Sequence, residues 1–178
     1  EPSRATLRGE LIPRRPPEGF PGGVIILHDP EVKSRYDLKP LSGAEGIELV
    51  PFPLAPRALS QQWKLPQLLR KLALDVFHAP YYFTAYRRLP CPMVLSLHDL
   101  IPIAYPPSMP SPLDRVSYRI AVRLALGAAQ RIIACSQATQ ADVARFDPAA
   151  GRRMTVIPDA PAPVFNPAPD GVVRRTRE

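Results

Sequence analysis

The chain has 178 residues, 46% of them hydrophobic, which suits one domain with a sizeable core and excludes a disordered polymer. No apolar run approaches the roughly 20 residues that a transmembrane helix needs, and no signal-peptide pattern is present. The formal net charge of +7 is explained in part by a composition rich in arginine, and its functional source would be an acidic partner. Phosphates or an anionic membrane are favoured over nucleic acid, because aromatic residues do not alternate with the basic ones.

The first part of the chain predicts a polar N-terminal segment followed by two strands. Residues 1–23 are rich in proline and glycine, and we expect them to be poorly ordered. Val24 to Leu27 form a continuous apolar run, which predicts a buried strand that ends at His28. A second strand is expected over residues 47–50, closed by Pro51.

The next part predicts a helix and two strands. A helix over residues 60–72 has leucines at helical spacing on one face, and Pro66 should kink it or mark its true first turn. Those leucines are Leu65, Leu68, Leu69 and Leu72. A short strand over residues 75–77 is expected to end at His78, and a strand over residues 93–97 follows.

The clearest helix is predicted over residues 112–129. Two stripes run along it: Val116, Ile120 and Leu124 are apolar, and Arg115, Arg119 and Arg123 lie just beside them. The arginines suit a solvated face or a surface for phosphates and anionic lipids. A strand over residues 131–135 follows, then a helix capped by Ser136 that runs to Phe146, then a strand over residues 154–157.

Strands that alternate with helices predict an α/β fold, a Rossmann-like parallel sheet with flanking helices. The two cysteines, Cys91 and Cys135, are far apart and are expected to be free thiols. The spacing of the histidines does not favour a metal site, and no GxSxG elbow, GxGxxG loop or Walker motif is present.

Three histidines, His28, His78 and His98, each follow a predicted strand. If those strands are parallel neighbours, the three rings lie along one rim, where α/β proteins bind ligands. His28 is better explained as a polar residue that leaves the core. His98 is the stronger candidate, because Asp99 follows it and a proline-rich loop could hold the pair in place.

Other polar and aromatic residues follow the strands. Ser136 stands where a strand turns into a helix, a position that offers free N–H groups to an anion, although an ordinary N-cap needs no ligand. Tyr81, Tyr82 and Phe83 could line a pocket or simply pack in the loop after His78.

Taken together, four segments resemble the N-terminal domain of family 4 (group 1) retaining glycosyltransferases of the GT-B fold. The segments are Asp75-Val76-Phe77-His78-Ala79-Pro80, Leu97-His98-Asp99-Leu100-Ile101-Pro102, Arg131-Ile132-Ile133-Ala134-Cys135-Ser136 with Thr139, and Val156-Ile157-Pro158-Asp159 with Phe165-Asn166-Pro167. The resemblance covers roughly residues 24–169, which are expected to form an incomplete Rossmann-like domain. Residues 170–178 would begin a C-terminal domain or tail.

The resemblance implies a two-domain enzyme of which this chain is the acceptor side. The opening strand would precede Glu1, and the donor domain that binds the nucleotide-sugar would follow residue 178, so the chain alone is expected to be inactive. The implied activity is retaining hexosyl transfer, of a mannosyltransferase-like kind, to a glycan or lipid-linked acceptor. It implies no metal or other cofactor, and a cytoplasmic enzyme, peripheral at the inner face of the membrane.

Residue roles also follow from the resemblance. His98 matches the histidine that reaches the donor sugar, and Asp99 would orient the loop or an acceptor hydroxyl. The implied substrate-binding residues are His78, Tyr81, Tyr82, Ser136 and Thr139. Asp159-Ala160 departs from the usual Asn-Gly. A non-catalytic sugar- or phosphate-binding module derived from such an enzyme is the main alternative, and a sugar phosphorylase is a weaker one.

Overall fold

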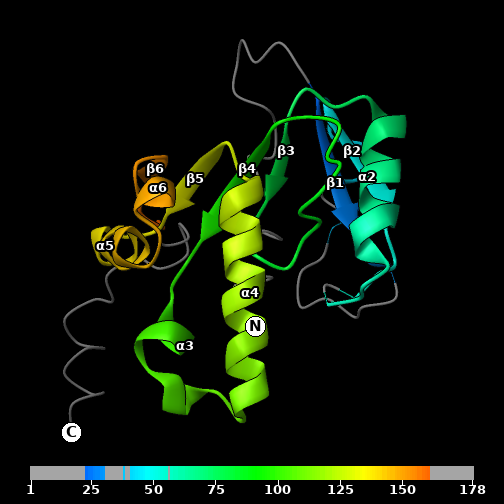
Figure 1. Cartoon of the computed structure of the whole chain (residues 1–178). Coiled ribbons are helices and arrows are strands. Elements are labelled where there is room, and N and C mark those ends of the chain that lie inside the picture. Colours follow the sequence, from blue (N-terminus) through cyan, green and yellow to red (C-terminus); the bar gives the residue numbers. More distant parts are fainter. Residues whose placement is uncertain (1–22, 31–37, 39–40, 56, 161–178) are drawn as a thin grey trace, which may run out of the picture.

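The structure, a computed structural model, describes residues 23–30, 38, 41–55 and 57–160, and it shows parallel strands flanked by helices (Figure 1). The elements are β1 (Val24–His28), β2 (Ile47–Pro51), α2 (Gln61–Leu72), β3 (Phe77–Ala79), β4 (Met93–Leu97), α3 (Ile101–Ala104), the 3-10 turn η2 (Pro106–Ser108), α4 (Pro112–Ala128), β5 (Arg131–Ala134), α5 (Gln137–Phe146), α6 (Pro148–Gly151) and β6 (Met154–Val156). The predicted α/β class is therefore confirmed. The expectations for residues 1–22 and 161–178 lie outside the described residues.

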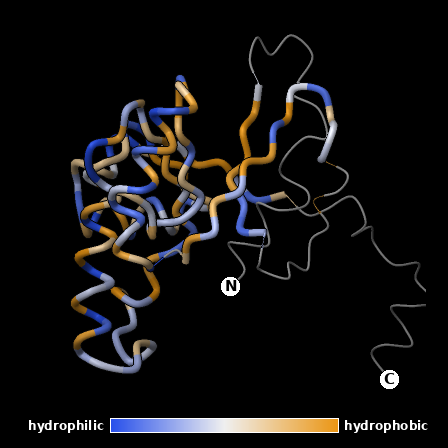
Figure 2. The backbone as a smooth tube through the Cα atoms, turned by 90° about the vertical axis from the view of Figure 1, so that its right-hand side faces the viewer, coloured by the Kyte–Doolittle hydropathy of each residue, from blue (hydrophilic) through white to orange (hydrophobic). Residues whose placement is uncertain are grey.

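The six described strands form two parallel sheets. One pairs β1 with β2, and the other has the order β3-β4-β5-β6. The pair β1–β2 stands to one side of the larger sheet in both views (Figures 1 and 2). No described strand bonds to both sheets, so the strand that ends at His28 is not a hydrogen-bonded neighbour of the strands that carry or precede the other two histidines.

One local prediction is wrong in its details, and another loses one of its two alternatives. β3 begins at Phe77, whose N–H bonds to the Pro92 carbonyl at 2.9 Å, so His78 lies inside the strand instead of after it. The strand starts where β4 first offers a partner, which the local sequence does not reveal. α2 continues through Pro66, which is buried in the helix and does not mark its first turn.

The main core lies between the larger sheet and its helices. β4 alternates strictly, with Met93, Leu95 and Leu97 buried on one face. Val122 and Leu126 of α4 belong to the same cluster and are fully buried. Burial of each large aliphatic side chain contributes about 1.5–3 kcal/mol, so this cluster fixes α4 against the sheet.

α4 begins as its sequence predicts, and its predicted apolar stripe faces solvent. Ser111 caps the helix by accepting a hydrogen bond from the Asp114 N–H at 3.1 Å, and Pro112 suits the first helical position. The buried face consists of Tyr118, Ala121, Val122, Ala125 and Leu126. The first half of α4 and α3 extend beyond the carboxyl ends of the strands (Figure 1). Among the described residues, no helix is long and apolar enough to cross a bilayer.

Candidate functional site

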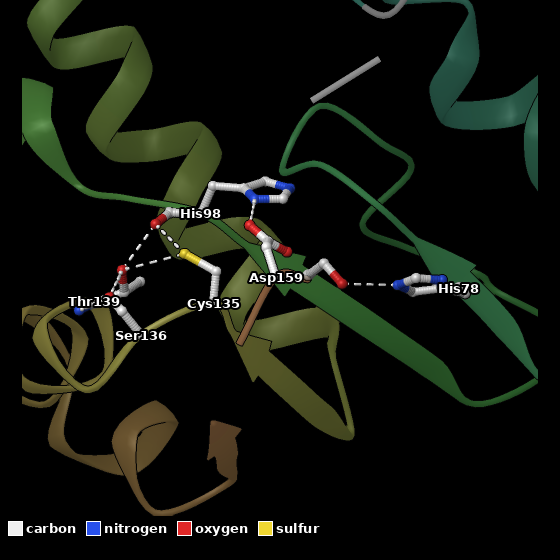
Figure 3. Close-up of polar contacts among 7 residues, drawn as sticks. His78, His98, Cys135, Ser136, Thr139 and Asp159 are labelled. Atoms are coloured by element: carbon white, nitrogen blue, oxygen red, sulfur yellow. Dashed lines mark hydrogen bonds and ion pairs between the residues drawn. The ribbon is translucent and has the colours of Figure 1, made fainter. Parts of the chain in front are cut away.

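Three neighbouring strands end in register, and this brings their following residues together. Leu97 of β4 pairs with Ala134 of β5, which in turn pairs with Val156 of β6. His98 and Cys135 come directly after the first two strands, and Asp159 comes three residues after the third. Figure 3 shows these side chains gathered at the carboxyl edge of the sheet, where the sequence predicted the site.

The start of α5 holds the His98 backbone in place. The His98 carbonyl accepts hydrogen bonds from the Thr139 hydroxyl at 2.7 Å and from the Cys135 thiol at 3.0 Å. Ser136 is the N-cap of α5, since its Oγ accepts from the Thr139 N–H at 3.1 Å, as predicted. Thr139 is buried, and its hydroxyl is committed to His98 (Figure 3). Substrate binding by Ser136 and Thr139 stays a prediction.

The His98 ring is accessible and faces a carboxylate. Its Nδ1 lies 3.8 Å from Oδ2 of Asp159, and the two side chains are 27% and 53% exposed. Asp159 was noted in the sequence only as a departure from the family pattern. An acidic side chain here can orient the ring and favour a proton on Nδ1, which leaves Nε2 as an acceptor.

A small pocket of about 60 Å³ lies beside His98. Its lining residues are Tyr81, Tyr82, Leu97, His98, Asp99, Pro102 and Tyr118. The Tyr81 hydroxyl donates to the Tyr82 hydroxyl at 2.9 Å, and the Tyr82 ring packs edge-on against Tyr118 with centroids 5.0 Å apart. Because one water needs roughly 10–15 Å³, the pocket admits a few waters or one ring substituent. Tyr81 and Tyr82 therefore line a pocket as predicted, whereas Phe83 does not line it, and substrate binding by the two tyrosines stays a prediction.

Asp99 points to the same pocket but has a local partner. Its Oδ1 accepts a hydrogen bond from the Ile101 N–H at 2.9 Å, which holds the start of α3. Burial raises the pKa of Tyr118 far above its usual value, and the negative charge of Asp99 adds to this shift. Tyr118, which the sequence reading missed, therefore stays protonated and can donate a hydrogen bond into the pocket.

His78 is not brought together with His98. Its Nε2 lies 2.8 Å from the Ser96 hydroxyl, and Figure 3 shows its ring at the right, apart from the cluster around His98. Desolvation lowers the pKa of His78, although the residue as a whole is exposed. Its predicted substrate contact stays a prediction, and it does not line the described pocket beside His98.

Comparison with protein families agrees with this geometry. A model of Glycosyltransferase Family 4 matches residues 24–160, which is more than half of the chain. The chain belongs to glycosyltransferase family 4. The predicted resemblance to this family is thereby confirmed, and the general activity that follows from it is glycosyl transfer. The search of curated proteins finds no match.

A second hollow in this glycosyltransferase domain lies away from His98. It has a volume of about 440 Å³ and shares no lining residue with the tyrosine pocket. Its walls come from α2 and the loop after β3, and they include Arg70, Arg87, Arg88 and Trp63. Although it is the larger hollow, it lacks His98 and Asp99, so the candidate reacting groups point to the smaller pocket.

Proposed function

We propose that this domain is the acceptor side of a retaining hexosyltransferase, of a mannosyltransferase-like kind, that uses a nucleotide-sugar donor and a glycan or lipid-linked acceptor. The observation that carries the proposal is His98: its backbone is braced by α5, and its ring is accessible beside the tyrosine pocket. Retention and the hexose class rest on the family resemblance. The product would enter envelope polysaccharide, O-antigen or glycolipid assembly.

In the proposed reaction, the bond from the anomeric carbon to the donor diphosphate breaks while the acceptor oxygen bonds to the same face. The acceptor proton passes to the leaving diphosphate. Positive charge develops on the sugar ring, and the Nε2 lone pair of His98 can accept from a sugar hydroxyl near this charge. Asp159 would keep the Nδ1 proton in place, 3.8 Å away. We propose that transfer needs no metal, because basic side chains and helix N-termini can stabilise the leaving phosphates.

The test is His98→Ala in the protein expressed from its complete gene, with His28→Ala as the control on the other sheet. Release of nucleoside diphosphate is measured for a panel of nucleotide-sugars with membrane extract as acceptor. Loss of one stabilising group in a transition state costs roughly 10²–10³ in kcat, so His98→Ala should lose that much while His28→Ala retains activity. Equal turnover in both variants contradicts the proposal, and saturable sugar binding without turnover in the wild type favours the non-catalytic module.

We also propose that α4 places the enzyme on an anionic membrane at the cytoplasmic face. An apolar stripe on this helix is 46–77% exposed, and it consists of Leu113, Val116, Ile120 and Leu124. Arg119 and Arg123, also exposed, stand beside it and pack over the ring of Phe146. In Figure 2 hydrophobic and hydrophilic residues alternate along the half of α4 that extends beyond the sheet. Apolar side chains flanked by arginines suit the interface of an anionic bilayer.

Vesicle co-sedimentation tests the membrane proposal. Each arginine near an anionic surface contributes about 1 kcal/mol, so Arg119→Gln/Arg123→Gln should weaken binding to phosphatidylserine vesicles by ~30-fold. The matched control, Arg131→Gln/Arg152→Gln, removes the same charge from exposed positions on other elements and should bind nearly as well as the wild type. The membrane proposal is contradicted if both double variants lose the same affinity for phosphatidylserine vesicles, or if the wild type binds neutral and anionic vesicles equally.

A further inference from the structure

We propose that His98, Cys135 and Asp159 form a binding site for a divalent transition metal, with Zn²⁺ as the best match. One ligand atom from each residue, an imidazole nitrogen, a thiol sulfur and a carboxylate oxygen, lies within 4.8 Å of the other two. Sequence spacing did not favour a metal because these residues belong to three separate segments. The in-register ends of β4, β5 and β6 bring the segments together.

The donor set and its dimensions suit zinc. Zinc accepts nitrogen, sulfur and oxygen ligands at roughly 2.0–2.3 Å in a tetrahedron, which places ligand atoms about 3.3–3.6 Å apart. The His98 Nδ1 to Asp159 Oδ2 distance of 3.8 Å is already close to this range. Because all three ligand atoms lie within 4.8 Å of one another, no pair needs to approach by more than about 1 Å. Asp159 can supply that movement, because it is exposed and follows the last described strand.

Loss of the thiol proton leaves no buried group without a partner. The Cys135 thiol now donates to the His98 carbonyl at 3.0 Å, and metal binding would release that proton to solvent. The carbonyl keeps the Thr139 hydroxyl as its donor at 2.7 Å. The thiolate and the Asp159 carboxylate together balance the two positive charges of the ion, and solvent can fill the fourth position because His98 and Asp159 are accessible.

Occupation of this site would switch off the reaction proposed above. The metal takes a ring nitrogen of His98 and the carboxylate that orients the ring, so His98 can no longer serve the donor sugar. This consequence rests on the proposed function, whereas metal binding itself does not. The metal is thus inhibitory, and transfer proceeds when the site is empty.

Cobalt absorption tests the site directly in the 178-residue chain. Co²⁺ titration should produce a thiolate-to-cobalt charge-transfer band and the visible bands of tetrahedral cobalt, saturating at one ion per chain, and Zn²⁺ should displace it. Cys135→Ser should abolish the charge-transfer band. Cys91→Ser, the matched control at the other free thiol, which is buried, should keep it. Asp159→Asn, at an exposed position, should weaken Zn²⁺ binding by at least roughly 10–100-fold, the loss seen when even an outer-shell partner is removed.

Circular dichroism first shows that each variant is folded, so that a change in metal binding can be assigned to the lost ligand. The proposed site is overturned if the charge-transfer band persists in Cys135→Ser or disappears in Cys91→Ser. It is also overturned if Asp159→Asn binds Zn²⁺ with unchanged affinity, or if the wild type shows no saturable metal binding. Because this assay contains no sugar, it does not depend on the transferase proposal. If the wild type binds zinc and His98→Ala keeps full transfer activity, the metal site is supported and the role of His98 in transfer is refuted.

Discussion

The contribution of the hydrogen bond to the His98 carbonyl can be measured by making the same substitution at two threonines. Thr139 and Thr84 are both buried, at 5% and 3% exposure. The Thr139 hydroxyl donates to the His98 carbonyl at 2.7 Å and lies 3.0 Å from the Ser136 hydroxyl. The Thr84 hydroxyl has no hydrogen-bond partner among the described residues. Thr→Val nearly preserves the side-chain shape and replaces the hydroxyl with a methyl group, so comparing the two sites isolates the contribution of the hydrogen bond.

The two substitutions should shift stability in opposite directions. A hydrogen bond contributes about 0.5–1.5 kcal/mol, and a polar group left buried without one costs about 1–3 kcal/mol. In Thr139→Val the carbonyl retains the weaker Cys135 thiol donor at 3.0 Å, so we expect a loss of about 1–2 kcal/mol. Thr84→Val removes a buried unpaired hydroxyl and should be neutral or stabilising by up to about 1 kcal/mol.

Urea unfolding followed by circular dichroism measures both changes, with unchanged m-values as the check that the denatured states are comparable. A difference of about 2 kcal/mol corresponds to a Tm gap of about 4–8 °C for a chain of this size. Equal destabilisation by the two substitutions, or a larger loss at Thr84, would refute the reasoning that the Thr139 hydroxyl holds the loop after β4.

Two further predictions concern packing and pH. A Cβ at Gly151 would lie 2.8 Å from the backbone Cα of Ala144, whereas one at Gly127 meets nothing within 4 Å. Gly151→Ala should therefore lower the free energy of unfolding by about 1–3 kcal/mol. Gly127→Ala in α4 should raise it by about 0.5–1 kcal/mol. Thermal unfolding measures both, and changes in Tm of the same sign for the two variants would contradict this prediction. Desolvation lowers the pKa of His78 from 6.5, so the unfolded chain binds its proton more readily. The stability of the wild type relative to His78→Gln should fall as the pH drops below 6.5, and a constant difference across pH denies His78 this role.

Local features were predictable because their determinants lie within a few residues. Ser136 was predicted as an N-cap, and it is one, because a serine at a strand-to-helix turn satisfies an N–H three residues ahead. Residues 93–97 were predicted as a strand, and the alternation of buried side chains in β4 follows from a period of two. α4 starts at Pro112, the first position of the predicted helix.

Features that depend on a distant partner were predicted less well. β3 starts at Phe77 because Pro92 and Met93 of the neighbouring segment pair with it there. The site shows the same limit. Cys135 was predicted only to be a free thiol, and Asp159 only to be an altered linker residue, yet both face His98. Thr139 is 41 positions from His98 in the sequence, and it donates to the His98 carbonyl.

The sequence by itself determined the α/β class, the family resemblance and His98 as the leading residue, because periodicity and motif order are properties of contiguous segments. Only the tertiary structure decided which residues surround that histidine. The pairing of Leu97, Ala134 and Val156 across three strands sets where each strand ends, and so which side chains emerge beside it. These parallel strands pair segments that lie far apart in the sequence, so the pattern within one segment does not show which residue of another it will face.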